Sequence, residues 1–178
     1  VIALLFARVG GLHQLLYDSI RNAFSKPTNE FLSGCLYNLT IHLTWFFGIH
    51  GPNLLDPVTH AIYSTAADAN AAALAAGQPL PQIITKVFFH SFVFLGGSGA
   101  TLGLVIAILL RSVDRSSRRI AMLGLVLTMF NINEMILFGL PIILNPVYFI
   151  PFIAAPMVLT LTSYLAIDWG LVAGTVNA

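Results

Sequence analysis

The most constraining feature of the sequence is a polar insertion, Asn-Ile-Asn-Glu, inside the long apolar run from residue 120 to residue 144. An ionised Glu134 in apolar surroundings costs several kcal/mol unless it is paired or hydrated, and no Lys or Arg is near it in the sequence. Asn131 and Asn133 would also lose their hydrogen bonds there. On a helix, Asn131 and Glu134 would share one face, because they are three residues apart. The insertion therefore predicts a polar cavity or, alternatively, a buried network that joins broken helices.

The composition indicates that the apolar run around this insertion lies in a membrane. Only 8% of the 178 residues are charged and 57% are hydrophobic, whereas soluble domains carry ~25% charged residues. So few charges could not cover the surface of a soluble domain, and we predict an all-α integral membrane protein. The net charge of +1 gives no reason to expect a nucleic-acid partner. The single cysteine, Cys35, supports neither an intrachain disulfide nor a multi-cysteine metal site, and we expect no cofactor or metal.

Apolar length predicts where the chain crosses the membrane. The segments long or apolar enough to enter it are 31–49, 87–110, 120–130 and 148–167. The second contains a glycine-rich interruption, and residues 61–82 are too polar to span, so we expect a loop or weak helix there. Four arginines within 111–119 predict a cytoplasmic loop. Prolines recur every five residues near the last crossing and predict broken helices that line a cavity: Pro141, Pro146, Pro151 and Pro156.

The first 30 residues differ from the remainder. Residues 1–30 are interpreted as the end of a preceding membrane segment followed by an amphipathic helix over 12–24. Residues 31–178 form the predicted membrane domain. Because the chain opens and closes beside apolar runs, we expect it to be a fragment of a longer protein.

A second polar cluster lies in residues 42–53, HLTWFFGIHGPN. Glycines flank His50, so that the backbone there can approach another group closely, and Trp45 is nearby. The alternative is a helix end with an interfacial tryptophan and a satisfied histidine. Together with Glu134 and the asparagines, these residue types suit a sugar, because rings stack on a pyranose while carboxylate, amide and imidazole bind its hydroxyls. The glycines of 94–103 fit either close helix packing, which we favour, or close approach to a ligand.

Three motifs in the same order and spacing, HLTWFFGIHG, GGSGATLGL and FNINEMILFGLPIILNPVYFIPFIAAP, carry a resemblance. The sequence resembles the lactose/cellobiose/diacetylchitobiose family of phosphotransferase-system permeases, the enzyme IIC domains, over most of residues 31–156. The resemblance implies transmembrane helices with two re-entrant hairpin-like segments, here around His50 and Asn131–Glu134. It also implies that this chain is part of the C-terminal, substrate-binding half of a ten-helix permease fold.

The resemblance implies a function as well. Such permeases bind a disaccharide in an occluded pocket, translocate it, and present its 6-hydroxyl to a cytoplasmic enzyme IIB whose phosphocysteine donates the phosphoryl group. By motif, the residues near that hydroxyl are His50 and Glu134, which we treat as catalytic candidates. Trp45, Asn131 and Asn133 are further candidate sugar contacts. The chain itself carries no phosphoryl group, so any enzymatic activity belongs to the sugar phosphotransferase complex.

The resemblance also implies partners and a location. We expect a multi-pass protein of the bacterial inner membrane, in contact with lipid and paired as a homodimer through a half absent from this sequence. The chain departs from the family pattern at Met135, where proline usually follows the glutamate, and at Thr128-Met129, where Pro-Gly is common. These departures favour a second hypothesis, an enzyme IIC-like sugar sensor fused to a cyclic-di-GMP signalling domain. A third is a structural membrane scaffold.

Overall fold

The structure is a computed structural model that describes residues 22, 24 and 29–177. The predicted N-terminal membrane segment and most of the amphipathic helix over 12–24 lie outside the described residues. Within the described part the chain is helical and has no strand, which confirms the all-α prediction at that level. Its helices are α3 Glu30–Phe46, α4 Gly51–Leu54, α5 Asp56–Val58, π-helical η1 Thr59–Ser64, α6 Thr65–Ala75, α7 Lys86–Phe88, π-helical η2 Phe89–Val93, α8 Thr101–Arg111, α9 Arg115–Met129, α10 Glu134–Gly139 and α11 Pro146–Asp168.

Polar caps set where the longer helices begin. The Asn29 side chain accepts hydrogen bonds from two backbone N–H groups at the start of α3. Asp114 does the same for α9. Asn145 caps α11, and Pro146 follows at the first helical position, where no N–H is needed. These caps are local signals, so the helix starts follow directly from the sequence.

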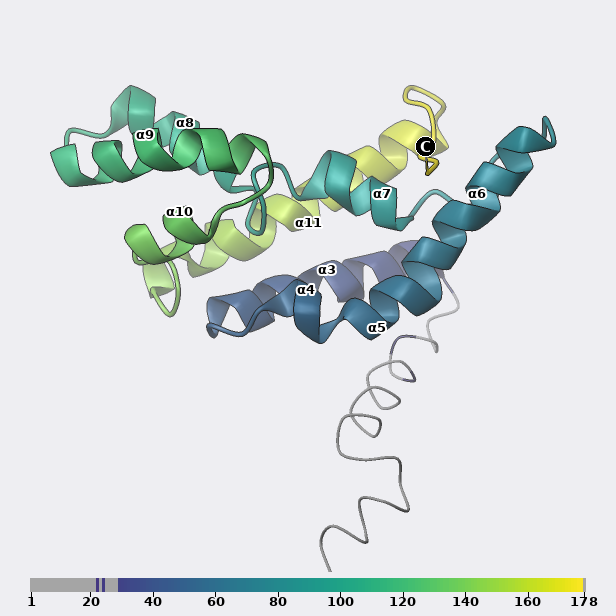
Figure 1. Ribbon diagram of the computed structural model, residues 1–178, viewed down its shortest axis with the longest axis horizontal. Helices are drawn as coiled ribbons and strands as arrows, with labels where there is room; N and C mark the ends of the chain where they lie inside the picture. Colours follow the sequence, from purple (N-terminus) through teal and green to yellow (C-terminus); the bar gives the residue numbers. More distant parts are fainter. Residues whose placement is uncertain (1–21, 23, 25–28, 178) are drawn as a thin grey trace, which may run out of the picture.

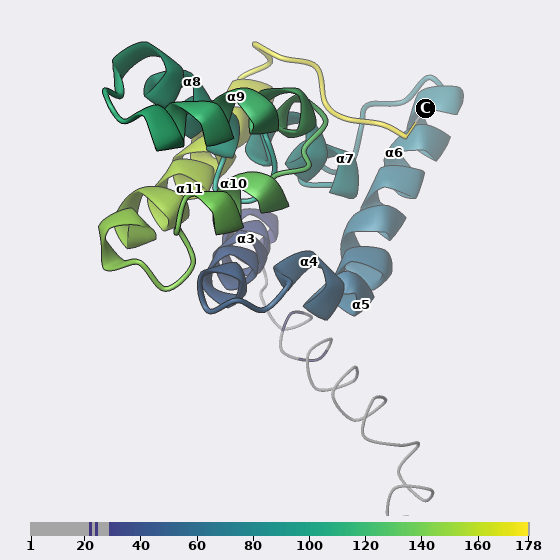
Figure 2. The same cartoon turned by 60° about the vertical axis from the view of Figure 1, so that its left-hand side comes forward.

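The two longest helices, α3 and α11, pack against each other (Figure 1). From the end of α3 the chain turns back through α4, α5 and η1 into α6. Helices α8 and α9 pair as a hairpin, and α10 turns back from α9, as the rotated view also shows (Figure 2). Both polar clusters of the sequence therefore lie at the turns of helical hairpins.

Helix α11 is the clearest candidate for crossing a membrane. It has 23 residues, and in the described part of the chain it is the one helix long and apolar enough to cross by itself. At 1.5 Å per residue it is about 35 Å long, enough for a hydrocarbon core of about 30 Å. The predicted segment 148–167 is thus confirmed as one apolar helix. The expected break is not found, because α11 continues through Pro151 and Pro156.

The structure divides one of the other predicted crossings. Segment 87–110 is interrupted as expected, since η2 ends at Val93 and α8 begins at Thr101. The arginine-rich segment is not a loop over all of 111–119, because Asp114 starts helix α9 and three of the arginines lie in it. Much of 61–82 is helical, as α6 extends to Ala75.

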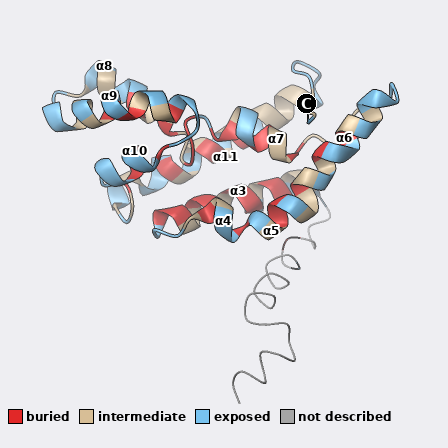
Figure 3. Cartoon of the chain, viewed as in Figure 1, coloured by how far each residue is buried: buried red, intermediate tan, exposed pale blue. Residues whose placement is uncertain are grey.

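The described core lies mainly where α3 and η2 pack against α11, and it also includes buried residues of α10. Figure 3 shows buried residues along α3, α7 and α11. Large apolar side chains remain exposed on α9, among them Met122, Leu123 and Val126. An exposed apolar face of this kind is typical of contact with lipid or with another protein surface.

Candidate functional site

One cavity of about 330 Å³ brings together the residues that the sequence singled out. It lies between α3, the α4–α5 segment, α7–η2, the glycine loop 94–100 and the turn before α10. All five predicted site residues line it: Trp45, His50, Asn131, Asn133 and Glu134. They come from segments far apart in the sequence, so the fold, not the motif spacing, places them together. Their roles remain a prediction.

The position of His50 is fixed by the short helix that follows it. His50 is the N-cap of α4, and its Nδ1 accepts a hydrogen bond from the Asn53 backbone N–H at 3.2 Å. Because Nδ1 is the acceptor, the neutral ring carries its proton on Nε2 and can donate it. The rings of His50 and Trp45 lie 4.6 Å apart. The histidine is therefore oriented by its own loop and by an aromatic neighbour.

The Asn-Ile-Asn-Glu segment is a turn and not part of a helix face. Asn131 has a left-handed backbone, with φ +61°, and α10 begins only at Glu134. The expectation that Asn131 and Glu134 share one helical face is therefore wrong, although both line the cavity. Asparagine is one of the few residues that adopt this backbone conformation readily, which explains why the chain can reverse here without glycine.

Both asparagines join this turn to the glycine loop. Asn131 Oδ1 accepts from the Gly96 N–H at 2.9 Å. Asn133 is buried, and its Nδ2 donates to the Ser98 carbonyl at 2.6 Å and to Thr101 Oγ1 at 2.8 Å. Since both Nδ2 hydrogens are used, Asn133 can offer a ligand only its oxygen. The described geometry thus gives Asn133 a clear positioning role.

The glycine loop is tight because it packs against the asparagine turn. Gly97 has φ +89°, and a Cβ at that position would lie 2.5 Å from Asn133 Cγ. Any other residue would push Asn133 away from its partners. Close packing, the favoured interpretation of this loop, agrees with this contact, and Gly97 and Ser98 line the cavity too.

Glu134 is the carboxylate available at this end of the cavity. It is exposed at the first position of α10. Among the described residues no ion pair involves it, since the pair that forms joins His60 and Asp56. With His50 Nε2 as a donor and the Glu134 carboxylate as an acceptor, the site offers complementary groups to one hydroxyl.

Sequence reasoning missed several polar residues of the same cavity. They are Tyr37, Asp56, Thr59, Lys86 and His90. Asn53, the last residue of the polar cluster 42–53, lines the cavity as well. In the sequence, Asp56 could have been found because it follows His50 closely, in the same break between helices. Lys86 could have been found because it stands at the start of the next apolar run. Within the described ranges no cluster of three His, Cys, Asp or Glu side chains could hold a metal ion.

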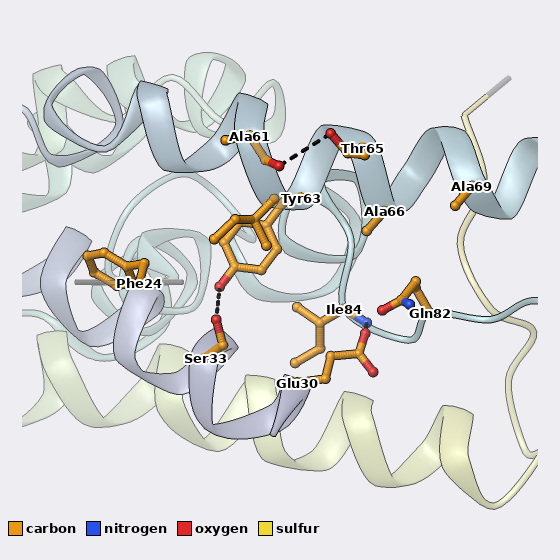
Figure 4. Close-up of a pocket in the computed structure, with 11 residues that line it drawn as sticks. Phe24, Glu30, Ser33, Ala61, Tyr63, Thr65, Ala66, Ala69, Gln82 and Ile84 are labelled. Carbon is orange, nitrogen blue, oxygen red and sulfur yellow. Dashed lines mark hydrogen bonds between the residues drawn. The ribbon is translucent and has the colours of Figure 1, made fainter. Parts of the chain in front are cut away.

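A larger cavity, about 480 Å³, lies elsewhere and contains none of the five predicted residues (Figure 4). Its polar groups bond to one another. Glu30 Oε1 accepts from the Ile84 N–H at 2.6 Å, and the Ser33 and Tyr63 hydroxyls lie 3.1 Å apart. We therefore assign the candidate site to the smaller cavity, whose imidazole and carboxylate groups are accessible.

Comparison with known proteins identifies the family of the chain. The family model for "Phosphotransferase system, EIIC" matches residues 1–156. The oligo-beta-mannoside-specific EIIC component of Bacillus subtilis is 40% identical over 162 residues, covering 88% of this chain and 37% of the relative. The cellobiose-specific EIIC component of Lactococcus lactis is 32% identical, covering 100% of this chain and 41% of the relative.

A solved structure has the same fold. The transporter ChbC, the IIC component from the N,N'-diacetylchitobiose-specific phosphotransferase system, superposes with a TM-score of 0.81 and 36% identity. The superposition covers 99% of this chain and 42% of ChbC. The fold and the family model together define a helical EIIC-type domain. The chain belongs to the phosphotransferase-system EIIC family and spans about two fifths of the length of the curated relatives it matches.

Proposed function

We propose that this chain forms the sugar-binding part of a phosphotransferase-system permease that takes up a disaccharide of the cellobiose, lactose or diacetylchitobiose type. The observation that carries the proposal is the single cavity lined by Trp45, His50, Asn131, Asn133 and Glu134. Relatives named for oligo-beta-mannosides and for cellobiose support the same class of substrate.

The chemistry at the reacting end follows from the donor and acceptor groups. His50 Nε2–H donates to the 6-hydroxyl oxygen and orients it, while Glu134 accepts its proton. The hydroxyl oxygen then attacks the phosphorus of the phosphocysteine on enzyme IIB. An oxygen–phosphorus bond forms, the phosphorus–sulfur bond breaks, and the cysteine leaves as a thiolate. The sugar phosphate is released on the cytoplasmic side.

In this proposal the fold is part of a larger membrane protein. The hairpin turns around His50 and Asn131–Glu134 act as two re-entrant segments of a ten-helix permease, which lies as a multi-pass protein in the bacterial inner membrane. A second copy pairs through a region outside this sequence. Enzyme IIB docks from the cytoplasm, and some relatives are named EIICB components, in which the IIB and IIC names are joined.

The sensor hypothesis has weaker support. The relatives described above are named as EIIC components, which favours transport over signalling. Met135, which motivated the sensor, lies in the first turn of α10, where a proline would remove no helical hydrogen bond. The hydrogen bonds of α10 therefore do not depend on whether methionine or proline follows Glu134. The scaffold hypothesis does not explain why an accessible carboxylate faces a histidine-lined cavity.

Calorimetry on the purified protein with a panel of disaccharides tests the proposal. We expect one of them to bind specifically, and Glu134→Ala to weaken that binding about tenfold or more, because a hydrogen bond to a charged group is lost. Glu30→Gln is the matched control, since Glu30 lines the other cavity. A folded protein that binds none of the panel would contradict the proposal.

A further inference from the structure

The candidate cavity extends well beyond the reacting end. Along α3 it reaches from Trp45, which contacts His50, to Tyr37, eight residues earlier. On a helix this separation is about 12 Å. One pyranose ring at His50 and Glu134 would leave the Tyr37 end empty, so a second ring of the ligand has room there.

The far end carries its own polar groups. The Tyr37 and Thr59 hydroxyls lie 2.6 Å apart, and both residues line the cavity there. Asp56 lies on α5, one turn before Thr59, and lines the same cavity as Tyr37. Its Oδ1 is 3.4 Å from His60 Nε2, which leaves Oδ2 for a ligand.

Lys86 lines the same cavity from α7. It begins α7, and α7 packs against η1, which starts at Thr59. One turn after Lys86, the Phe89 ring lies 4.8 Å from the Tyr37 ring, so this segment packs against α3 near Tyr37. In the described structure Lys86 and Asp56 line one cavity without forming an ion pair. An unpaired ammonium group and a carboxylate are thus presented to whatever fills this end.

We infer that Asp56 and Lys86 form a distal subsite that binds the hydroxyls of the sugar ring that is not phosphorylated, and that this subsite selects unsubstituted hexoses over N-acetylated ones. A carboxylate accepts hydrogen bonds from neighbouring hydroxyls, and an ammonium group donates to their oxygens. An acetamido group replaces one such hydroxyl and adds bulk, and its single N–H is fixed in the amide plane, whereas a hydroxyl rotates to donate to the carboxylate. The inference rests on the proposed function, because it assumes that a disaccharide occupies the cavity.

Binding measurements on the purified protein test the subsite, with cellobiose, glucose and N,N'-diacetylchitobiose as probes. Asp56→Asn and Lys86→Met should each weaken cellobiose binding about tenfold, as expected for losing a hydrogen bond to a charged group. Glucose, held at the reacting end, should bind these variants as it binds the unmodified protein, which also shows that they are folded. Asp68→Asn is the matched control, since Asp68 lies on α6 outside the cavity.

The selectivity is tested with the same proteins. The unmodified protein should bind cellobiose more tightly than N,N'-diacetylchitobiose, and Asp56→Asn should reduce that preference. If Glu134→Gln weakens cellobiose binding while Asp56→Asn and Lys86→Met bind it normally, the subsite is overturned and the proposed function stands. Equal loss of glucose and cellobiose binding in Asp56→Asn would also overturn it. If the folded protein binds no disaccharide, both are overturned.

Discussion

At the scale of single residues, the site depends on positions where a side chain is excluded. Gly97 and Gly99 both have positive φ and lie against other elements of the fold, Gly97 against Asn133 and Gly99 against Phe152 on α11. The glycine loop is thereby held between the asparagine turn and the long helix. A larger residue at either glycine should displace these contacts and so alter the shape of the cavity.

Replacing Gly99 with alanine separates this packing from backbone strain. Gly77, at the end of α6, also has positive φ, but no described atom would lie within 4 Å of a Cβ added there, so Gly77→Ala reports strain alone. That strain costs about 1–2 kcal/mol. Gly99→Ala should cost about 1–3 kcal/mol more, because its methyl group meets the Phe152 ring. Unfolding by denaturant in detergent measures both, and equal costs would contradict the packing explanation.

At the scale of elements, the sequence predicts more of the helices than of the turns. Apolar length locates α11 and the two parts of 87–110, because burial in lipid or protein requires such runs. It does not reveal the turn at Asn131, since a left-handed asparagine has no distinct pattern in one sequence. The prolines in α11 predict breaks, but Pro151 and Pro156 are accommodated within a continuous helix.

The same distinction applies to the candidate site. The asparagine turn and the His50 loop can be found in the sequence because polar residues stand out in apolar runs. Asp56 and Lys86 were missed because they lie at the ends of such runs, where charged residues are ordinary. Only the folding of α5 and α7 toward α3 shows that they line the same cavity.

The start of α9 gives a prediction for pH. The Ser117 hydroxyl and backbone N–H, and the Ser116 N–H, bond to the Asp114 carboxylate and hold its pKa below the ordinary value of 3.8. Because the folded pKa is the lower one, this stabilisation is present above pH 3.8 and is lost as the pH falls through the folded pKa.

Asp114→Asn checks this sign, because asparagine keeps the cap but does not titrate. The thermal midpoint of the unmodified protein should exceed that of Asp114→Asn at about pH 6, and the difference should shrink as the pH is lowered toward about 3. A difference that is constant over this range would show that the ionised carboxylate contributes nothing specific to the cap.

At the scale of the whole molecule, the arginines predict an orientation in the membrane. Arg111 ends α8, and α9 carries Arg115, Arg118 and Arg119 in its first turns, so the tip of this hairpin is the most basic region described. Positive charge is enriched on the cytoplasmic side of membrane proteins. We therefore expect the α8–α9 tip to lie in the cytoplasm, on the side from which enzyme IIB would approach.

Labelling with a membrane-impermeant thiol reagent tests that orientation. Cys35, the single natural cysteine, is first replaced by alanine, and Ser116→Cys then places a thiol at the tip. The thiol should react in inverted vesicles but not in intact cells, and permeabilised cells serve as the control for its reactivity. Reaction in intact cells would reverse the proposed topology.

The central claim is that Glu134 accepts the proton of the hydroxyl that is phosphorylated. Its most direct test is the rate of sugar phosphorylation by phosphorylated enzyme IIB at saturating disaccharide, for the complete permease and its Glu134→Gln variant. We predict a rate lower by about 10²-fold or more in the variant, because general-base catalysis contributes at least that much, and an unchanged rate for Glu30→Gln. Phosphorylation at the normal rate by Glu134→Gln would contradict the claim.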